Sequence, residues 1–311
     1  MENKVLGIHH ITAIAGNAKR NYEFYTNVLG LRLVKKTVNF DDPGTYHFYF
    51  GDEAGTPGTI LTFFPWQNIP RGRQGTGMAT DIGYSVPKGS LQQWKERLER
   101  FNVHITGTGE RFGEEFLSFE DPDGLPITLV VPALIDDRKP WETDEVKAIM
   151  AVRGFHSTTL SLRSISKTSR VLTEILGYRF EKTEGNRHRY ITSAIKGAAT
   201  VDLSELPSAA RAMNAGGTIH HIAFRVPDEN VLMEYREKVL AHGLNITTKI
   251  DRNYFFSLYF REPGGVLFEL ATDNPGFAVD EPLSQLGTSL KLPPQYESSR
   301  AEIEKVLPSL S

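Results

Sequence analysis

The chain has 311 residues, a formal net charge of -3 and no cysteine. This length supports two compact domains, and the interspersed acidic and basic residues offer neither a basic surface for nucleic acid nor a polybasic membrane anchor. We therefore expect a small, neutral or weakly acidic ligand. Without cysteine, disulfides, thiolate metal sites and a cysteine nucleophile are excluded, so any metal must be held by nitrogen and oxygen.

The start of the chain, MENKVLGIHH, lacks the apolar run and the small-residue cleavage site of a signal peptide. No apolar run elsewhere approaches the length of a membrane span. We therefore expect a cytoplasmic protein that does not associate with a membrane. The sequence leaves the oligomeric state open, a homo-oligomer included.

Four units of similar design follow one another along the chain. Each begins with a short β-like run, continues into an amphipathic helix of about a dozen residues and closes with strands separated by turns. The first helix is predicted at 18–29, where Gly30 ends it, and the second at 90–101. The four units cover residues 7–65, 79–131, 153–206 and 217–272.

Two pairs of matching segments show a tandem duplication. SVPKGSLQQWKERLERFNVHI, from Ser85, aligns with RVPDENVLMEYREKVLAHGLNI, from Arg225. DPDGLPITL, from Asp121, aligns with EPGGVLFEL, from Glu262, at nearly the same offset. The pattern predicts an α+β fold of four βαβββ modules in two tandem halves.

The predicted boundaries of these halves are residues 7–131 and 153–273, each with two modules. Between them, residues 132–152 form a charged, proline-bearing stretch that is typical of a linker. Residues 274–311 form a tail that ends in a short charged helix, and we expect this tail to drape over the surface.

Two histidine pairs stand in nearly the same hexapeptide, His9-His10 in GIHHIT and His220-His221 in TIHHIA. Together with Glu269 in GGVLFEL they suggest one metal site. Two imidazoles and one carboxylate on one side of a metal leave the other side open, as is typical of non-heme Fe(II) oxygenases. A single strand histidine is more often a core residue than a ligand, so the prediction depends on the three residues together.

Strand alternation selects the ligands within each pair. It places His10, His221 and Glu269 on one face with the residues two positions away, and it points His9 and His220 to the opposite face. The residues expected on the ligand face are Ile8, Thr12, Ile219, Ala223, Leu267 and Ala271. The other histidines have no partnered motif, and we interpret them as structural or surface residues: His47, His104, His156, His188 and His242.

The duplication provides an internal comparison for this site. The three ligand candidates align with residues of other kinds, Ser157, Asp81 and Thr128. This pattern indicates a scaffold that kept one site and lost the equivalent one. Because His10 belongs to the first unit while His221 and Glu269 belong to the fourth, the first and fourth units must pack together.

The four modules resemble the vicinal oxygen chelate superfamily. Within it, FGDEAGTPGTILTFFP, DRNYFFSLYFREPGGVLFELAT and the tail segment ELATDNPGFAVDEPLSQLG resemble ring-cleaving dioxygenases that act on hydroquinones, over nearly the whole chain. The resemblance implies a non-heme iron enzyme that inserts O2 into a hydroquinone-type or catechol-type ring, in aromatic degradation or quinone detoxification. Its cofactor would be Fe(II), with Mn(II) as an alternative, and its partners a small aromatic diol and O2. It also implies that the site forms within one chain rather than between subunits.

The resemblance further implies roles for four residues. Tyr259 in SLYF and Arg252 in DRNYF match positions that line the substrate pocket, where Tyr259 would hydrogen-bond the metal-bound substrate oxygen and Arg252 would stabilise developing negative charge. His9 and Thr12 match positions behind the ligands, suited to orientation and proton transfer, although a bulge would have to re-aim His9. Several aromatic residues could line a flat pocket, with core packing the more usual role: Phe63, Phe64, Trp66 and Tyr190.

Three alternatives stay open. A glyoxalase-type lyase usually needs a four-ligand site with two glutamates, whereas Thr62, Thr128 and Val201 or Asp202 occupy the other candidate positions here. A catechol-cleaving enzyme normally takes both histidines from the second half, where this sequence has Ser157. A metal-free small-molecule-binding resistance protein would not retain all three ligands on matching faces.

Overall fold

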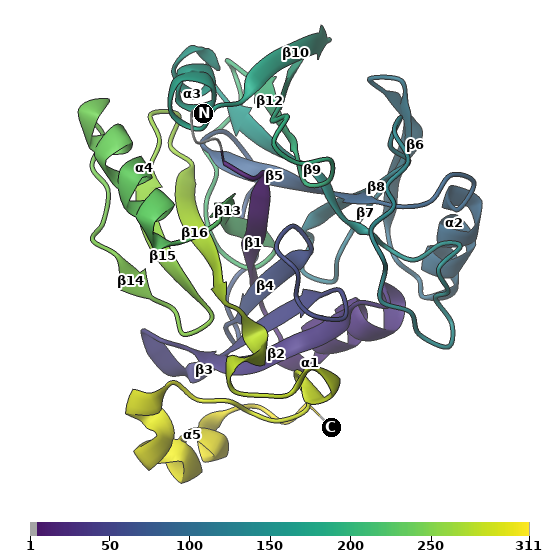
Figure 1. The fold of residues 1–311 in the computed structure, drawn as a ribbon. Helices are drawn as coiled ribbons and strands as arrows, with labels where there is room; N and C mark the ends of the chain where they lie inside the picture. The colour runs from purple at the N-terminus through teal and green to yellow at the C-terminus, as the bar shows by residue number, and fades with distance from the viewer. Residues whose placement is uncertain (1–4, 311) are drawn as a thin grey trace.

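The computed structural model describes residues 5–310, so the first four residues of the start, where no signal peptide is expected, lie outside the described residues. Two curved eight-stranded sheets dominate the fold, with few helices (Figure 1). In the described part of the chain, no helix is both long enough and apolar enough to cross a membrane.

Sheet A combines the first and fourth units of the chain. Its strand order is β14-β15-β16-β13-β1-β4-β3-β2. The central strands β1 and β13 pair antiparallel, while β4 and β16 run parallel to them on either side. The strands are β1 (Ile8–Ala15), β2 (Arg32–Asn39), β3 (Asp42–Gly51), β4 (Ile60–Pro65), β13 (Thr218–Val226), β14 (Ile250–Asp251), β15 (Phe255–Arg261) and β16 (Leu267–Pro275). The predicted packing of the first unit against the fourth is confirmed, within one chain.

Sheet B repeats this design with the second and third units. Its strand order is β10-β11-β12-β9-β5-β8-β7-β6, with β5 and β9 antiparallel at the centre. The strands are β5 (Met78–Ser85), β6 (Ile105–Arg111), β7 (Glu114–Glu120), β8 (Pro126–Val130), β9 (Gly154–Leu162), β10 (Arg179–Glu184), β11 (Arg187–Ile191) and β12 (Thr200–Glu205). The predicted α+β fold of four βαβββ modules is confirmed. Each sheet takes one module from each half, and the boundaries of the halves as domains stay a prediction.

One helix follows the first strand of each module. They are α1 (Ala18–Glu23) with the π-helix η1 (Phe24–Val28), α2 (Leu91–Arg100), α3 (Ser166–Arg170) with the π-helix η2 (Val171–Ile175), and α4 (Glu229–Ala241). The helix predicted at 18–29 is therefore α1 plus η1, and Gly30, with a φ of 69°, takes the left-handed conformation expected after its end. The widened π turns occur in the two aligned modules, a detail that apolar periodicity did not reveal.

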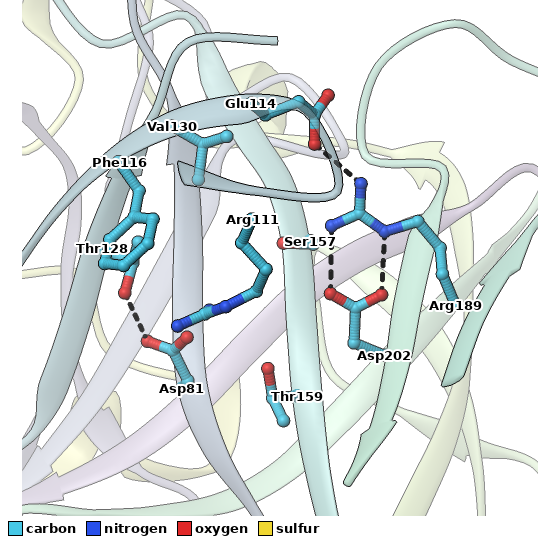
Figure 2. A pocket seen from close by; sticks show the side chains of 10 residues that line it. All are labelled: Asp81, Arg111, Glu114, Phe116, Thr128, Val130, Ser157, Thr159, Arg189 and Asp202. Atoms are coloured by element: carbon cyan, nitrogen blue, oxygen red, sulfur yellow. Dashed lines mark hydrogen bonds and ion pairs between the residues drawn. The ribbon is translucent and has the colours of Figure 1, made fainter. Parts of the chain in front are cut away.

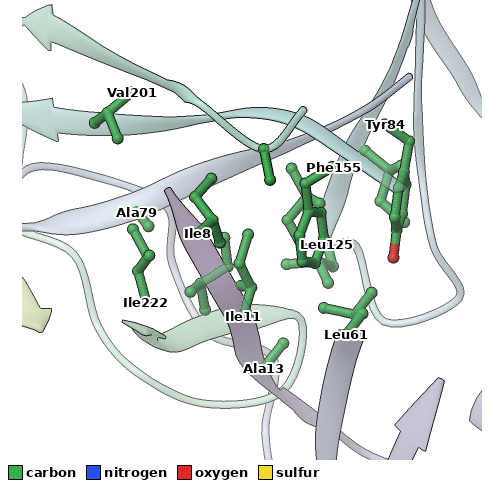
Figure 3. Close-up of a cluster of buried hydrophobic side chains, with 14 of the residues drawn as sticks. Ile8, Ile11, Ala13, Leu61, Ala79, Tyr84, Leu125, Phe155, Val201 and Ile222 are labelled. Atoms are coloured by element: carbon green, nitrogen blue, oxygen red, sulfur yellow. The ribbon is translucent and has the colours of Figure 1, made fainter. Parts of the chain in front are cut away.

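The two sheets share one hydrophobic core. Ile11 of β1 and Ile222 of β13 come from sheet A, and Phe155 of β9 and Val201 of β12 come from sheet B (Figure 3). Each sheet therefore commits one face to this core. Polar side chains of each sheet also line a cavity, and sheet A packs against the tail through a second buried cluster.

Hydrogen bonds attach the connection between the halves, residues 132–152, to the rest of the fold. The Arg138 guanidinium donates to the carbonyl of Gly58, before β4, and to the carbonyl of Phe155 in β9. The buried Trp94 indole of α2 donates to the carbonyl of Met150. These bonds fix the connection to both sheets.

The tail does not simply drape over the surface as expected. Phe277 and Leu286 are buried in a cluster with residues of sheet A, and the fully buried Lys35 of β2 pairs with Asp280 and Glu281 at 2.5 Å each. An ion pair this deep joins the tail to sheet A, because a buried charge needs its partner. The tail elements are η3 (Phe277–Val279), η4 (Leu283–Gln285), η5 (Pro294–Ser299) and α5 (Arg300–Val306), the last being the predicted short helix.

Candidate metal centre

Two β-bulges in the pairing of β1 with β13 place the histidine pairs. His9 is the extra residue on β1, and His220 is the extra residue on β13. A bulge sets two residues of one strand against one of its partner and so interrupts the alternation of faces. The bulge required to re-aim His9 is therefore present, and His220 has its counterpart.

The bulges also correct part of the parity expectation. Ile8 and Ile219 do not share the ligand face, since both lie in the hydrophobic core with Ile11. Thr12 and Leu267 do line the cavity beside the ligands, as expected. The alternation of faces predicted from the sequence fails only across the extra residue, because one added residue reverses which face the residues beyond it point to.

The three predicted ligands converge. His10 Nε2 lies 3.2 Å and His221 Nε2 lies 2.8 Å from Glu269 Oε2, and the two nitrogens are 3.4 Å apart. Ligand atoms about 2.1 Å from one ion lie about 3.0 Å apart at right angles and about 3.4 Å apart at tetrahedral angles. The observed triangle spans this range, and all three side chains are buried. The group could hold a metal ion.

The carboxylate of Glu269 fits a metal better than it fits a hydrogen-bonded role. Oε1 accepts a hydrogen bond from Ser257, whereas no donor in the described part of the chain makes a well-formed hydrogen bond to the buried Oε2. Burial alone would raise the pKa of Glu269, but His10 and His221 hold that pKa well below its usual range. An ionised, unshared oxygen facing two imidazoles is a site for a cation.

Hydrogen-bond direction assigns a proton to Nδ1 of His10. The Thr272 carbonyl can only accept, so His9 Nε2, 3.1 Å away, must carry a proton. Burial, together with His10, lowers the pKa of His9 well below its usual value, so the ring is neutral and its Nδ1 accepts. His10 Nδ1, 2.9 Å from that atom, is therefore the donor, and His10 Nε2 is the nitrogen that faces Glu269 and would bind a metal.

His220 supports His221 in the same manner. Its Nδ1 lies 2.8 Å from His221 Nδ1, while its ring lines the cavity. Burial and the neighbouring His221 lower the pKa of His220 to about 3, so this imidazole is neutral. The sequence predicted that His220 points away from the site, and the bulge explains why it does not.

A cavity of about 360 Å³ opens beside the triad. Of the residues predicted from the resemblance, Tyr259, Arg252 and Thr12 line it, whereas His9 lies behind His10. The Arg252 guanidinium carbon is 5.4 Å from the centre of the Tyr259 ring, and its Nη1 is 3.9 Å from the Asp41 carboxylate at the cavity rim. The volume falls within the usual range for small-ligand pockets.

Several wall residues were assigned other roles from the sequence. Phe64 and Trp66 line the cavity instead of the core, whereas Phe63 and Tyr190 are core residues. His47, interpreted as structural or surface, is also part of the cavity wall. The signal was available in β3, where Thr45, His47 and Tyr49 alternate with Tyr46, Phe48 and Phe50 and so mark one polar face.

The equivalent face of sheet B holds the residues that align with the ligands. Asp81, Thr128 and Ser157 come together there, as the repeat predicted (Figure 2). The same bulges recur, with Thr80 as the extra residue on β5 and His156 on β9. Thr128 donates to Asp81 at 2.9 Å, in the place where His221 meets Glu269 in sheet A. The backbone of the site is duplicated although its ligands are not.

Charged side chains fill this second position. Arg189 donates to both oxygens of Asp202 and to Glu114, and Arg111 extends toward Asp81 (Figure 2). Burial would raise the pKa of Glu114, but His156 and Arg189 lower it to about 2. A cavity of only about 10 Å³ is left, about the space of one water.

The candidate positions for a fourth ligand lie in different parts of the two sheets. Thr62 lies on the cavity face of sheet A, where it hydrogen-bonds Thr12 at 2.8 Å. Thr128 and Asp202 belong to the charged cluster of sheet B, and Val201 lies in the core. Within residues 5–310, no second glutamate joins the triad.

Comparison with known proteins agrees with this architecture. The family model described as Glyoxalase/Bleomycin resistance protein/Dioxygenase superfamily matches residues 7–129 and 154–270. MhqO of Bacillus subtilis (strain 168), named as a ring-cleaving dioxygenase, is 46% identical over 99% of this chain and 97% of its own length. The chlorohydroquinone/hydroquinone 1,2-dioxygenase of Sphingobium indicum is 34% identical over 99% and 97% of the two chains.

A solved structure supports the same family, and a second one shares the fold. The crystal structure of a Bacillus subtilis protein named as a dioxygenase superposes with a TM-score of 0.95 at 45% identity, covering 99% of this chain and 98% of that one. Glyoxalase I from Zea mays shares the fold, with a TM-score of 0.63 at 14% identity over 86% and 92% of the chains. The chain belongs to the Glyoxalase/Bleomycin resistance protein/Dioxygenase superfamily.

Proposed function

We propose that this protein is an Fe(II)-dependent dioxygenase that cleaves a hydroquinone-type aromatic ring with O2. The observation that carries the proposal is the convergence of His10, His221 and Glu269 at one wall of an aromatic-lined cavity. The relative named as a chlorohydroquinone/hydroquinone 1,2-dioxygenase supports the choice of a para-diol over a catechol. We place the enzyme in the cytoplasm, in aromatic degradation or quinone detoxification.

The donor set suits the proposed metal. Two imidazoles and one carboxylate on one side of an ion form the arrangement that non-heme Fe(II) oxygenases use, and Mn(II) accepts the same donors. A ferrous ion held there would supply open positions for a diol and O2 and a path for electron density between them. His9 and Ser257 hold the ligands in place, by the hydrogen bonds to His10 and Glu269.

Three cavity residues would act on the substrate. Burial raises the pKa of Tyr259, so its hydroxyl stays protonated and can donate to a substrate oxygen. The cationic Arg252 beside it would balance the charge of an ionised diol, and the Thr12 hydroxyl faces the same space. His9 is proposed to orient His10 rather than to carry protons, because its Nε2 proton is held by the Thr272 carbonyl.

The cavity wall also supports an aromatic substrate. Phe64, Trp66 and Phe255 line it, and the Phe255 ring centre lies 4.9 Å from that of His10. Flat apolar walls of this kind suit a single ring with two polar ends. A glyoxalase-type proton transfer is less well supported, because Thr62 stands where a second carboxylate would be required.

Oxygen uptake by the Fe(II)-reconstituted protein tests the proposal. Hydroquinone, catechol and a methylglyoxal–thiol adduct are offered in parallel, with Glu269→Ala as the variant that lacks a ligand. We expect oxygen consumption with hydroquinone in the native protein and none in the variant. No uptake with any dihydroxybenzene at full iron loading would refute the dioxygenase proposal, and isomerisation of the adduct would favour the lyase.

A further inference from the structure

A row of four polar side chains crosses the cavity face of sheet A next to the triad. Thr12 of β1 is 2.8 Å from Thr62 of β4, Thr62 is 2.9 Å from His47 Nε2 of β3, and His47 Nδ1 is 3.0 Å from the Tyr49 hydroxyl. Thr12, Thr62 and Tyr49 are almost completely buried. Thr12 is the strand partner of His221, so the row ends beside the metal ligands.

The ring of His47 lines the cavity, yet both of its nitrogens are committed to this row. It therefore has no ring nitrogen left to hydrogen-bond a ligand directly. A hydrogen-bonding effect of His47 on a bound molecule therefore has to pass through Thr62 to Thr12, whose hydroxyl can still donate one hydrogen bond.

Hydrogen-bond direction can be followed from one end of the row to the other. Burial raises the pKa of Tyr49 well above its usual value, so its hydroxyl keeps its proton, and His47 Nδ1 is the acceptor that the structure provides. Burial also lowers the pKa of His47, with further lowering by His10, His221 and Arg252 and an opposing effect of Glu269. A neutral His47 that accepts at Nδ1 must donate from Nε2 to the Thr62 oxygen.

The last two steps follow in the same way. Thr62, which accepts from His47, has one proton left and one neighbouring acceptor, the Thr12 oxygen. Thr12 then receives a hydrogen bond, and its own proton has no acceptor among the described residues, so it is free to point into the cavity. The row thus makes Thr12 a donor, and a donor favours an ionised oxygen over a neutral hydroxyl.

We propose that Tyr49, His47 and Thr62 are positioning residues that orient the Thr12 hydroxyl as a hydrogen-bond donor toward an ionised oxygen of the substrate. This inference rests on the proposed function, since it assigns the ionisation state in which a diol is held. It adds to the site a specificity for the mono-anion. Tyr259 and Arg252, on the opposite side of the triad, would meet the same ligand from β15 and the turn before it.

Two measurements without turnover test the row. In the metal-free protein, long-range 1H–15N NMR should show His47 as a neutral imidazole protonated at Nε2, with the signal assigned by its loss in His47→Gln. In the Fe(II)-loaded protein under anaerobic conditions, 4-nitrophenol reports its own ionisation by absorbance. We expect Thr62→Val to raise the apparent pKa of the bound probe by about one unit, which is about tenfold weaker phenolate binding.

Matched variants separate orientation from folding. Thr62→Ser keeps the hydroxyl and should restore the native probe pKa, and Thr128→Val removes a buried threonine hydroxyl from sheet B and should leave the probe unchanged. If Thr62→Val does not fold, Tyr49→Phe keeps the ring and should release His47 from its single tautomer. A Thr62→Val protein with the native probe pKa overturns the proposal, and so does a native His47 protonated at Nδ1. Neither result depends on oxygen uptake, so failure of this proposal can be distinguished from failure of the proposed dioxygenase activity.

Discussion

The cavity faces of sheets A and B have the same backbone arrangement, but the cavity is open in sheet A and filled by side chains in sheet B. In sheet A, His10 and His221 face Glu269 Oε2, which has no hydrogen-bond partner among the described residues, and about 360 Å³ lies open beside the three side chains. In sheet B, Arg189 binds Asp202 and Glu114, and about 10 Å³ is left. Both faces keep paired bulges in their central strands. The comparison teaches that the bulges create a position where side chains must meet, and the side chains then decide whether a cation or an arginine occupies it.

The largest expected effect is on metal binding. His10→Ala, His221→Ala and Glu269→Ala should each weaken Fe(II) binding by more than about 100-fold, beyond what loss of a supporting residue costs. Ser157→Ala, the aligned position in sheet B, should leave binding intact. Metal content after anaerobic loading and desalting measures this. If His10→Ala kept iron and Ser157→Ala lost it, the metal site would lie in sheet B and the assignment to sheet A would be wrong.

Sheet B should respond in stability instead. Arg189→Met leaves Asp202 and Glu114 buried without their partner, and we expect the free energy of unfolding to fall by about 3–5 kcal/mol in urea titrations. Iron affinity should be unchanged in the folded protein. Arg170→Met, which breaks an exposed pair with Glu174, serves as the control and should leave the free energy of unfolding nearly unchanged. Equal losses in the two variants would mean that the buried cluster does not stabilise sheet B.

The cluster should also make stability depend on pH. The pKa of Glu114 is about 2 in the folded protein, below its ordinary value, so its contribution is complete above the unfolded pKa near 4.5 and is lost as the pH falls toward 2. Glu114→Gln lacks this dependence. We expect the difference in unfolding free energy between native protein and variant to shrink by about 2 kcal/mol between pH 6 and pH 3. A constant difference across this range would contradict the assigned pKa.

The smallest effect is expected from the group that holds the carboxylate. Ser257→Ala removes the hydrogen bond to Glu269 Oε1 and should weaken Fe(II) binding about tenfold, with a loss of stability near 1 kcal/mol. Ser118→Ala removes the hydroxyl that meets Thr128 in sheet B and is the control. Competition with a chelator of known affinity measures the iron affinity of both variants, and urea titration measures their stability. If Ser118→Ala weakened iron binding as much, the two faces would be coupled through the core.

The triad was predictable because it needed only residue type, repeat alignment and the end of each strand. His10, His221 and Glu269 were identified without knowledge of any contact, and the requirement that the first unit meet the fourth followed from them. The four modules were predictable for the same reason, since each repeats one order of strand and helix. The comparison with Ser157, Asp81 and Thr128 then separated the ligand candidates from their aligned counterparts.

The features that were not predictable depend on partners far away in the sequence. The bulges at His9 and His220 arise from the register of two strands more than 200 residues apart, so neither strand alone reveals where alternation breaks. Nothing in the local sequence marks Lys35 for burial, and only the fold brings Asp280 and Glu281 of the tail to it. Burial of this kind is decided by the assembled fold rather than by local pattern.

The pairing of β1 with β13 also affects folding during synthesis, because the two strands are made at different times. On the ribosome, β1 emerges about 200 residues before its antiparallel neighbour β13, and Glu269 comes later still. At about 5–20 residues per second, His10 waits roughly 10 to 50 s for the rest of its site. During that time β1 presents an unpaired edge, the kind of surface on which strands of other chains aggregate. A chain interrupted before its last module would lack two of the three residues of the metal centre and would keep this edge exposed, so joining β1 to β13 completes the site and covers the edge in the same event.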